Sequence, residues 1–451
     1  MAVSLIILAA GQGTRMNSER PKVLHELAGA PLLIHAMKSG AVLAPERVVV
    51  VVGVGADEVA KAALDWNPDT RVAVQAEQLG TGHAVLAARD ALAGFHGDVI
   101  VLYGDTPFMT EATLQAMLDA RSRGDVIFLG FEPVDPARYG RMVMAGDSLE
   151  AIIEYKDADA ATRAITLCNG GVVAADAQGL FSLLDQVTPH NAQGEYYLTD
   201  IVEIARAQGL KATVVRCPEA ETLGINTRAQ LAAAEDLFQA NARALATEDG
   251  VTLTNPATII FAHDTVIGRD AVIAGPVVFG PGVTIESDAR IRPFSHLEGC
   301  HVSRGATVGP FARLRPGAEL AEDVHVGNFV EIKNAIVAEG AKINHLSYIG
   351  DADIGERSNI GAGTITCNYD GVSKHRTTIG KRVFVGSNTM LVAPVSLGDG
   401  AMTASGSVIT QDVPAGDLAI GRAKQVNKPG LALRMFDRLR ALKASKNKGA
   451  L

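Results

Sequence analysis

IGRDAVIAGPVVFGPGVTIESDARIRPFSHL, residues 267–297, carries a large apolar residue at every sixth position. The series is Ile267, Ile273, Phe279, Ile285, Ile291 and Leu297. After a one-residue slip it resumes at Val302 and continues, with breaks, to Ile409. Side chains repeat every 2 residues in a strand and every 3.6 in a helix, so neither element produces this period. Hexads are typical of a left-handed parallel β-helix, in which each six residues form one flat side of a coil and the apolar residues stack inside it.

The β-helix by itself does not specify a function, because stacked coils can form either a passive oligomerisation stalk or the body of an enzyme. Polar residues interrupt the hexads at residues 314–317, 331–333 and 344–348, and a longer, turn-rich break covers residues 366–378. A stalk has no need of such a loop, nor of Arg, Lys, His and Tyr gathered at nearby coils. The interruptions therefore favour an enzyme.

The length and charge of the chain narrow the remaining classes. A chain of 451 residues is too long for one ordinary core, so we expect two or more domains. Its net charge of −9 argues against nucleic-acid binding through a broad basic surface. The four cysteines are far apart and form no CxxC pair, which indicates a reducing compartment and no zinc site. No apolar run approaches membrane-spanning length, and we expect a soluble, cytoplasmic protein without a membrane partner.

The first half of the chain alternates apolar runs with Ala-rich stretches. Strand-like runs cover residues 5–8, 48–52, 99–102 and 126–129. Near-continuous Val and Ile runs separated by helices predict a parallel sheet covered on both faces, whose ligands bind beyond the carboxyl ends of the strands. The expected organisation is a Rossmann-like α/β domain over residues 1–227, a connecting helix over 228–250, the β-helix over 251–421 and a basic tail over 422–451.

The first of these strands ends in a glycine loop, LAAGQGTRM at residues 8–16, and Lys22 follows shortly after it. Gly11 and Gly13 allow a tight turn close to a phosphate, and Lys22 supplies positive charge. The loop is not a dinucleotide fingerprint, because Met16 stands where the third glycine would be, and no Gly-Lys-Ser/Thr closes a Walker motif. A plain strand-to-helix turn would also explain a bare Gly-x-Gly.

Further motifs follow the glycine loop in order. They are QAEQLGTGHA at 75–84, YGDTP at 103–107, YGR at 139–141, Glu154, NGG at 169–171, EYYLTD at 195–200 and GINT at 224–227. With the loop, they resemble the sugar-nucleotide pyrophosphorylases, which join a nucleoside triphosphate to a sugar 1-phosphate. The resemblance implies that Arg15 and Lys22 act in catalysis and that Asp105 and Asn226 hold Mg²⁺. The residues it assigns to nucleotide and sugar are Leu8, Ala9, Ala10, Gly11, Lys22, Gln75, Gly80, Thr81, Tyr103, Gly104, Asp105, Gly140, Glu154, Asn169 and Asn226.

The reaction of that family needs these residue types. A sugar phosphate attacks an α-phosphate, so two polyanions must meet, and positioning and charge neutralisation carry most of the catalysis. Asp105 follows the strand-like run at 99–102, the usual place for a carboxylate that holds Mg²⁺ in such a sheet. Because Mg²⁺ keeps several waters, Asp105 with Asn226 is a sufficient pair of protein ligands.

The break at residues 344–348 contains His345. Hexad domains with an exposed His resemble acyltransferases that use coenzyme A thioesters. A histidine has a pKa near neutrality, so it can take the proton as an amine attacks the thioester carbonyl. We expect Glu331 to orient that imidazole and to stabilise its cation. A lone His is also common on a solvated surface, so the assignment depends on its neighbours.

Taken together, the two halves resemble one family over nearly the full length, the bacterial bifunctional N-acetylglucosamine-1-phosphate uridyltransferases and glucosamine-1-phosphate N-acetyltransferases. This resemblance implies synthesis of UDP-N-acetylglucosamine from UTP and acetyl-CoA with Mg²⁺, in a homotrimer whose acetyltransferase sites lie between chains. It assigns the sugar phosphate to Arg315, Lys333, Tyr348, Asn359 and Lys374, and acetyl-CoA to Ala362, Asn368, Tyr369, Ser387, Ser405 and Arg422. Two alternatives remain open: another pyrophosphorylase, for ADP-glucose or GDP-mannose, with the hexads as scaffold, and a non-enzymatic subunit that keeps the fold.

Overall fold

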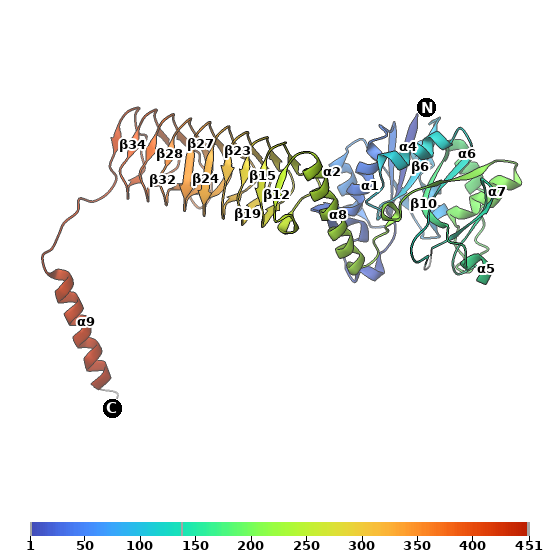
Figure 1. Ribbon diagram of the computed structural model, residues 1–451, viewed down its shortest axis with the longest axis horizontal. Helices are drawn as coiled ribbons and strands as arrows, with labels where there is room; N and C mark the ends of the chain where they lie inside the picture. The colour runs from blue at the N-terminus through green and yellow to red at the C-terminus, as the bar shows by residue number, and fades with distance from the viewer. Residues whose placement is uncertain (1, 137–138, 449–451) are drawn as a thin grey trace. The chain divides into compact units, whose positions relative to one another are not determined.

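A computed structural model describes residues 2–136 and 139–448 (Figure 1). The chain folds into two compact units. The first comprises Met1–Ala246 together with the short segment Ile260–Thr265, and the second comprises Thr247–Ile259 and Val266–Leu451.

The first unit is built on one sheet with the strand order β11-β7-β10-β6-β1-β4-β5, extended at β10 by the hairpin of β8 and β9. Its strands are β1 (Val3–Leu8), β4 (Arg47–Gly53), β5 (Arg71–Gln75), β6 (Asp98–Tyr103), β7 (Val126–Phe131), β8 (Arg141–Ala145), β9 (Ser148–Ile153), β10 (Cys168–Asp176) and β11 (Ala212–Arg216). A small hairpin is formed by β2 (Glu26–Leu27) and β3 (Ala30–Pro31). The four expected strand-like runs are β1, β4, β6 and β7, as predicted.

The sheet is mixed, and the expectation of a parallel sheet was wrong in this respect. Strand β10 runs antiparallel to both of its neighbours, β6 and β7, while β1, β4, β5 and β6 pair in parallel. The apolar pattern did not reveal this, because residues 172–175 of β10 are buried on both faces, as in a central parallel strand.

Helices cover both faces of this sheet, as Figure 1 shows in the blue-to-green part of the chain. The helices are α1 (Leu32–Ala41), α2 (Asp57–Trp66), α3 (Thr81–Ala87), α4 (Glu111–Ala120), α5 (Ala160–Arg163), α6 (Ala177–Leu184), α7 (Ile201–Ala207) and α8 (Arg228–Glu248). Alternate residues of β1 serve the two cores: Leu5 and Ile7 pack with α1, α2 and α4, and Ile6 and Leu8 pack with α3, α6 and α7. This double cover leaves the carboxyl ends of the strands as the place for a ligand.

Helix α8 begins after Thr227, whose hydroxyl accepts a hydrogen bond from the Gln230 N–H at 3.2 Å, as expected of an N-cap. Its buried Gln239 pairs with the backbone of Phe261 in both directions, each bond measuring 2.8 Å. The segment Ile260–Thr265 is therefore held to the first unit by a side-chain amide that imitates a strand backbone.

The second unit is a left-handed parallel β-helix made of short strands in two sheets. One flat side contains β12 (Thr252–Thr254), β15 (Val272–Ala274), β18 (Arg290–Ile291), β21 (Thr307–Val308), β24 (His325–Asn328), β26 (Lys342–His345), β28 (Asn359–Ile360), β31 (Phe384–Val385), β34 (Met402–Thr403) and β36 (Leu418–Ala419). The other sides contain β13 (Ile259–Ile260), β14 (Val266–Ile267), β16 (Val277–Phe279), β17 (Thr284–Ile285), β19 (Ser295–Leu297), β20 (Cys300–Val302), β22 (Arg313–Leu314), β23 (Ala318–Leu320), β25 (Glu331–Val337), β27 (Tyr348–Ile354), β29 (Ile365–Cys367), β30 (Thr377–Ile379), β32 (Met390–Val392), β33 (Val395–Leu397) and β35 (Val408–Ile409).

The register of these strands confirms the predicted interior ladder. Ile267 pairs with Ile285, which makes a coil of 18 residues, and Ile285 pairs with Val302, which makes one of 17. The one-residue slip in the sequence is therefore a shortened coil that keeps the apolar residues aligned. In one coil Ile354 pairs with Ile379, so the chain between them is longer, and it forms the loop that follows β29.

This loop organises itself. Tyr369 and Lys374 form an antiparallel bridge, and the His375 N–H donates to the Asn368 carbonyl at 2.8 Å. Backbone N–H donors at Ser373 and Val372, with the His375 ring, hold the pKa of the Asp370 carboxyl well below its usual range. The loop is therefore a closed hairpin pushed out of the coil.

The tail contains a helix that was not expected, α9 (Leu431–Lys448). Its described side chains, from residue 431 to residue 445, are all exposed. Across the described parts of the chain, no helix combines the length and the apolar character that crossing a membrane requires.

Candidate active sites

A cavity of about 420 Å³ opens beside the carboxyl ends of β1 and β6 in the first unit. Its lining includes eleven of the sequence-predicted nucleotide and sugar residues: Leu8, Ala9, Ala10, Gly11, Lys22, Gln75, Gly80, Thr81, Tyr103, Asp105 and Asn226. It also includes Val23, Gln78, Ala84 and Glu195, which sequence reasoning did not single out as site residues. Three of these lie inside or beside the quoted motifs, so the motif boundaries were the signal that could have found them.

The glycine loop reaches the cavity because of one residue in a left-handed conformation. Gly13 has φ +64°, and a Cβ built on it would lie 2.4 Å from the Cβ of Lys22. Only glycine allows Lys22 to approach so closely. Gly11 needs no such conformation and faces open space, so its role is to leave the cavity clear.

The QAEQLGTGHA motif is fixed by the EYYLTD motif. Gly80 has φ +111°, and an added Cβ would meet the Tyr196 carbonyl at 2.7 Å. The Gly82 N–H donates to that carbonyl at 2.8 Å, and the Leu198 N–H donates to the Thr81 hydroxyl at 3.0 Å. The two motifs, far apart in the sequence, thus form one wall of the cavity.

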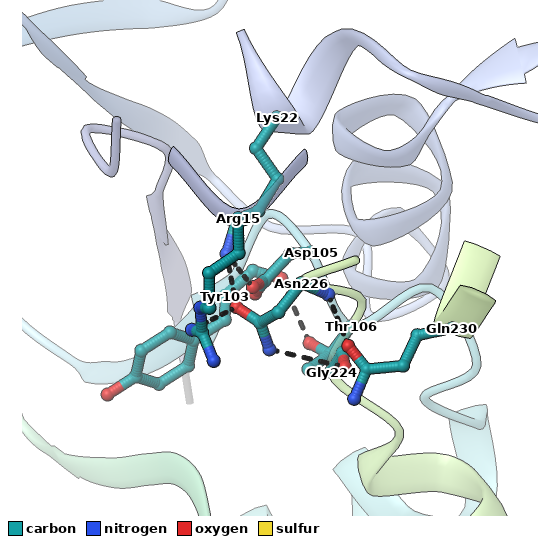
Figure 2. A network of polar contacts seen from close by, with 8 residues as sticks. All are labelled: Arg15, Lys22, Tyr103, Asp105, Thr106, Gly224, Asn226 and Gln230. Carbon is teal, nitrogen blue, oxygen red and sulfur yellow. Dashed lines mark hydrogen bonds and ion pairs between the residues drawn. The ribbon is translucent and has the colours of Figure 1, made fainter. Parts of the chain in front are cut away.

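Figure 2 shows the polar network at the floor of the cavity. The Lys22 ammonium forms an ion pair with Asp105 and donates to the Asn226 side-chain oxygen at 3.0 Å. The Arg15 guanidinium donates to the same oxygen at 2.9 Å. All four residues were predicted from the sequence, and the structure brings them together.

One residue of this network was missed. The Asn226 N–H donates to the side-chain oxygen of Gln230 at 2.8 Å, and the Ile225 N–H donates to the Asp105 carbonyl at 3.0 Å. Gln230 lies one helical turn beyond Asn226, which is the sequence signal that could have found it. These bonds hold the backbones of Asp105 and Asn226 side by side.

The pair Asp105 and Asn226 fits a magnesium ion. Both present oxygen atoms, and because one ammonium reaches both, those oxygens converge on a common point. Within the described residues no group of three or more His, Cys, Asp or Glu side chains forms a closed metal cage. Mg²⁺ does not need one, since it usually retains waters and uses one or two protein oxygens plus substrate phosphates.

The predicted sugar residues lie beside this cavity. A Cβ on Gly140 would lie 3.2 Å from the Glu154 carboxylate, and the Asn169 N–H donates to the Gly140 carbonyl at 2.9 Å. Burial, followed by the nearby Asp157 and Asp200, raises the pKa of Glu154. Burial and the same Glu154 charge raise the pKa of Tyr103, which connects this group to the main cavity.

Gly104 supports this arrangement without lining the cavity. Its N–H donates to the Leu8 carbonyl at 2.9 Å, and a Cβ would approach that oxygen to 3.2 Å. Glycine therefore lets the β6 end lie directly against the β1 end.

In the second unit, His345 is exposed at the end of β26. Its Nδ1 lies 2.6 Å from the Asn328 side-chain oxygen, and that residue is its register partner in the preceding coil. An amide oxygen accepts, so Nδ1 carries the proton and Nε2 is the basic nitrogen. This differs from the expectation for Glu331, which instead pairs with Arg315 at 2.8 Å. Register explains the difference, because Glu331 stacks on Tyr348 rather than on His345.

Most of the predicted acetyl-CoA residues stack above His345 in a single column at one turn of the β-helix. The column is Asn328, His345, Ala362, Ser387 and Ser405. Each carbonyl from Asn328 to Ser387 accepts from the N–H that follows the next column member, at 2.7–3.2 Å. Arg422 lies just beyond, with its Cδ 3.9 Å from a Cβ built on Gly406.

The predicted sugar-phosphate residues form a second group. Contact with the Lys374 side chain, together with burial, lowers the pKa of Lys333. Burial opposes ionisation of Asp351, yet hydrogen bonds from Asn334 and Asn368 hold the pKa of its carboxyl below the ordinary value. Two crowded ammonium groups with one carboxylate leave this surface ready for an anion.

The remaining predicted residues lie at the edges of these groups. The Tyr348 hydroxyl lies 3.5 Å from the Asn368 amide nitrogen. Asn359 lies on the flat side that carries His345, stacked between Lys342 and Phe384. Tyr369 lies in the extruded loop, where its hydroxyl donates to the Gly371 carbonyl at 2.6 Å.

The fold and these two sites define a class, an α/β nucleotidyltransferase joined to a hexapeptide-repeat acyltransferase. Residues 5–167 match the family model of the MobA-like NTP transferase domain, and residues 296–395 match that of the GMPPB C-terminal domain. The bifunctional protein GlmU of Ruegeria sp. is 67% identical over 449 residues, covering 100% of both chains. The bifunctional protein GlmU of Paracoccus denitrificans is 65% identical over 443 residues, covering 98% of this chain and 99% of the relative. The chain belongs to the GlmU family of bifunctional proteins.

A solved structure of a UDP-glucose pyrophosphorylase complexed with UDP-glucose is more distantly similar. It is 17% identical, has a TM-score of 0.42, and is covered over its whole length by 53% of this chain.

Proposed function

We propose that the two activities of this bifunctional enzyme are divided between its two units. The enzyme makes UDP-N-acetylglucosamine by acetyl transfer from acetyl-CoA to glucosamine 1-phosphate and then by Mg²⁺-dependent uridylyl transfer from UTP, with release of pyrophosphate. The cavity of the first unit, with Asp105 and Asn226 at its floor, is the observation that supports this division most strongly.

In the uridylyl step, the glycine loop and the wall at Gly80 and Thr81 hold UTP, and Lys22 with Arg15 neutralises its phosphates. Mg²⁺ supplies further neutralisation of the transferring phosphate when it is bound by Asp105 and Asn226. The sugar phosphate enters beside Glu154, whose raised pKa suits a group that exchanges hydrogen bonds with hydroxyls. Catalysis is then chiefly positioning and charge neutralisation.

In the acetyl step, Nε2 of His345 takes the proton from the amine of glucosamine 1-phosphate as that nitrogen attacks the thioester carbonyl. The carbon–sulfur bond breaks, and the proton passes to the leaving thiolate. Asn328 keeps the imidazole in the required tautomer. Lys333 and Lys374 hold the sugar phosphate, and the column from Ala362 to Ser405 lies along the bound acetyl-CoA.

The direct test measures both half-reactions on one purified sample. We expect acetylated product from acetyl-CoA and glucosamine 1-phosphate, and UDP-N-acetylglucosamine from UTP in preference to ATP, GTP or TTP. Formation of a different sugar nucleotide, with no acetyl transfer, would support the scaffold alternative instead.

The acetyltransferase sites are completed between chains of a homotrimer. The hydrogen bonds described for His345 run to Asn328, Ser347 and Gly363, and none of these residues contacts the group around Lys374. The extruded loop also has an exposed tip, where Val372 is 89% exposed. A neighbouring chain would bring a second loop to each His345, and cyclic symmetry would make all three sites equivalent.

Mixing two inactive variants tests this assembly. Chains with His345→Ala and chains with Lys374→Ala, unfolded together and reassembled at equal amounts, should regain up to about a quarter of the sites. The mixed trimers are verified by native mass spectrometry. No recovery in verified mixed trimers would place both groups in one chain.

The substrates also suggest where the enzyme acts. UTP and acetyl-CoA are cytoplasmic metabolites, and the four cysteines are free thiols. A cytoplasmic location follows from these points, and cell fractionation with activity assays would test it.

A further inference from the structure

The proposed magnesium ligands are already engaged by side chains of the same chain. Asn226 has one side-chain carbonyl oxygen, and that oxygen accepts from Lys22 at 3.0 Å and from Arg15 at 2.9 Å. A carbonyl oxygen has two lone pairs, so both are used. Asp105 is ion-paired with the same Lys22 ammonium.

The ammonium group lies where the metal would have to be. Its nitrogen contacts one oxygen of Asp105 and the oxygen of Asn226, the two atoms that converge on the ion position (Figure 2). A divalent cation bound to both oxygens would sit at roughly 2 Å from each, within the space of the ammonium. The two cations therefore exclude one another, by volume and by repulsion.

The pair is also shielded from solvent. The Lys22 and Asp105 side chains are only 13% and 14% exposed. Water and salt screen such a pair less than a surface pair, so the ammonium is held firmly when nothing competes for it. It also lines the cavity in which the triphosphate is proposed to bind, so phosphate oxygens would be its natural competing partners.

We propose that Lys22 is a placeholder for the metal, which closes the ion site until a nucleotide draws its ammonium onto the phosphates. Arg15 assists by filling the second lone pair of Asn226. When the phosphates engage both cations, Asp105 and Asn226 are released to Mg²⁺. The inference rests on the proposed uridylyl transfer, and it makes metal binding conditional on nucleotide binding.

This arrangement has a purpose that follows from charge. An acidic residue and an amide oxygen at a cavity floor would bind a metal or other cations in the absence of substrate, and the site would then have to release them. With Lys22 in place, the floor stays neutral and ordered, and the metal enters only where a triphosphate is ready to share it.

The test uses Mn²⁺ alone as the probe, with free Mn²⁺ followed by electron paramagnetic resonance and no nucleotide present. If Lys22 closes the site in about nine molecules of ten, Lys22→Gln should lower the Kd for Mn²⁺ about ten-fold relative to the wild type. Lys22→Arg keeps a cation and should stay as weak as the wild type. Circular dichroism confirms that each variant is folded.

A second substitution shows where the ion binds. Adding Asp105→Asn to Lys22→Gln should abolish the gain, since it removes the charged ligand. Equal Mn²⁺ affinity of the wild type and Lys22→Gln would overturn the proposal, as would a gain that survives Asp105→Asn. Uridylyl transfer by the wild-type sample is measured in parallel: its absence would contradict the proposed function, whereas activity without an Mn²⁺ gain would contradict only the placeholder.

Discussion

The cavity of the first unit and the turn column of the second are two opposite solutions to binding a large anionic substrate. The cavity collects its residues from loops at the ends of several strands, and those loops are locked to one another within one chain. The column places its residues at one turn of successive coils, on an open surface. A sheet with helices on both faces creates a concave edge, while a prism has flat sides and no concavity of its own.

The difference predicts how each site depends on its surroundings. A site formed by loops of one unit should act without the other unit. A site on a flat side needs a second surface to enclose its ligand, which is the reason to expect a neighbouring chain. The predictions that follow test this contrast.

The largest effect is expected at the cavity floor. Asp105→Ala removes the charged metal ligand and should lower uridylyl transfer by about 10³-fold, because the charge of the transition state is no longer neutralised. Acetyl transfer should be unchanged, since the residue lies in the other unit. Loss of both rates in a folded protein would break the contrast.

The reverse substitution applies to the column. His345→Ala should lower kcat of acetyl transfer by about 10²–10³-fold, because the amine loses its general base. Uridylyl transfer of the same sample serves as the internal control. An acetyl rate close to that of the wild type would remove His345 from the proposed role.

Truncation separates the units while respecting the contact between α8 and Phe261. A fragment of residues 1–243 should transfer UMP, but a fragment of residues 1–265 should unfold at a higher temperature. The longer fragment keeps both bonds of Gln239, and leaving that buried amide without partners costs about 1–3 kcal/mol. Thermal unfolding of both fragments measures this, and Gln239→Ala in the longer one should reduce the difference. An inactive yet folded longer fragment would show that the cavity needs the β-helix.

A smaller effect is expected at the residue that orients His345. Asn328→Ala should lower acetyl transfer about ten-fold, since the imidazole loses its fixed tautomer. Asn328→Asp accepts the same bond and should restore most of the rate, while its charge moves the acidic limb of the pH profile to higher pH. If the aspartate variant were as slow as the alanine variant, the bond would be structural only.

The smallest effect concerns stability near the sugar residues. Burial, with Glu203 and Asp157 nearby, raises the pKa of Asp200 from 3.8 to about 6. The folded state then holds its proton more tightly than the unfolded state, so this group's contribution to stability is lost as pH rises from about 4 to about 6. Asp200→Asn should therefore stabilise the protein at pH 7.5, by at most about 1 kcal/mol because the side chain is half exposed and solvent screens it. Thermal unfolding at pH 7.5 and pH 4 checks the sign, since no gain is expected at the lower pH.

The sequence predicted most of the fold because the two periodic patterns are local. The hexads identified the β-helix, and the slip after Leu297 correctly indicated one shortened coil. The antiparallel course of β10 was not predictable from hydropathy, since a strand buried on both faces looks the same in either direction. The tail helix α9 also escaped, because its described side chains are exposed and it has no core to pattern it.

The cavity was predictable residue by residue because its loops are spelled out in contiguous motifs. Asn328 was not found, because it meets His345 only through a coil of 17 residues, a spacing that the hexads give only once the shortened coils are counted. For the same reason Glu331, close to the site in sequence, was expected beside His345 although it stacks on Tyr348. The roles assigned to the individual site residues stay predictions until the variants above are measured.

The stacking of coils also makes the β-helix a ruler. Successive members of the column are separated by one strand spacing, about 4.8 Å, and each points in the same direction as the last. The distance from His345 to Ser405 is therefore counted in whole coils and cannot drift with side-chain packing. Adding or deleting one complete coil between them would change the length of ligand that fits by one graduation and leave every side chain facing the same way. A change in substrate length is thus available to this fold as a single insertion, without redesign of any residue that touches the ligand.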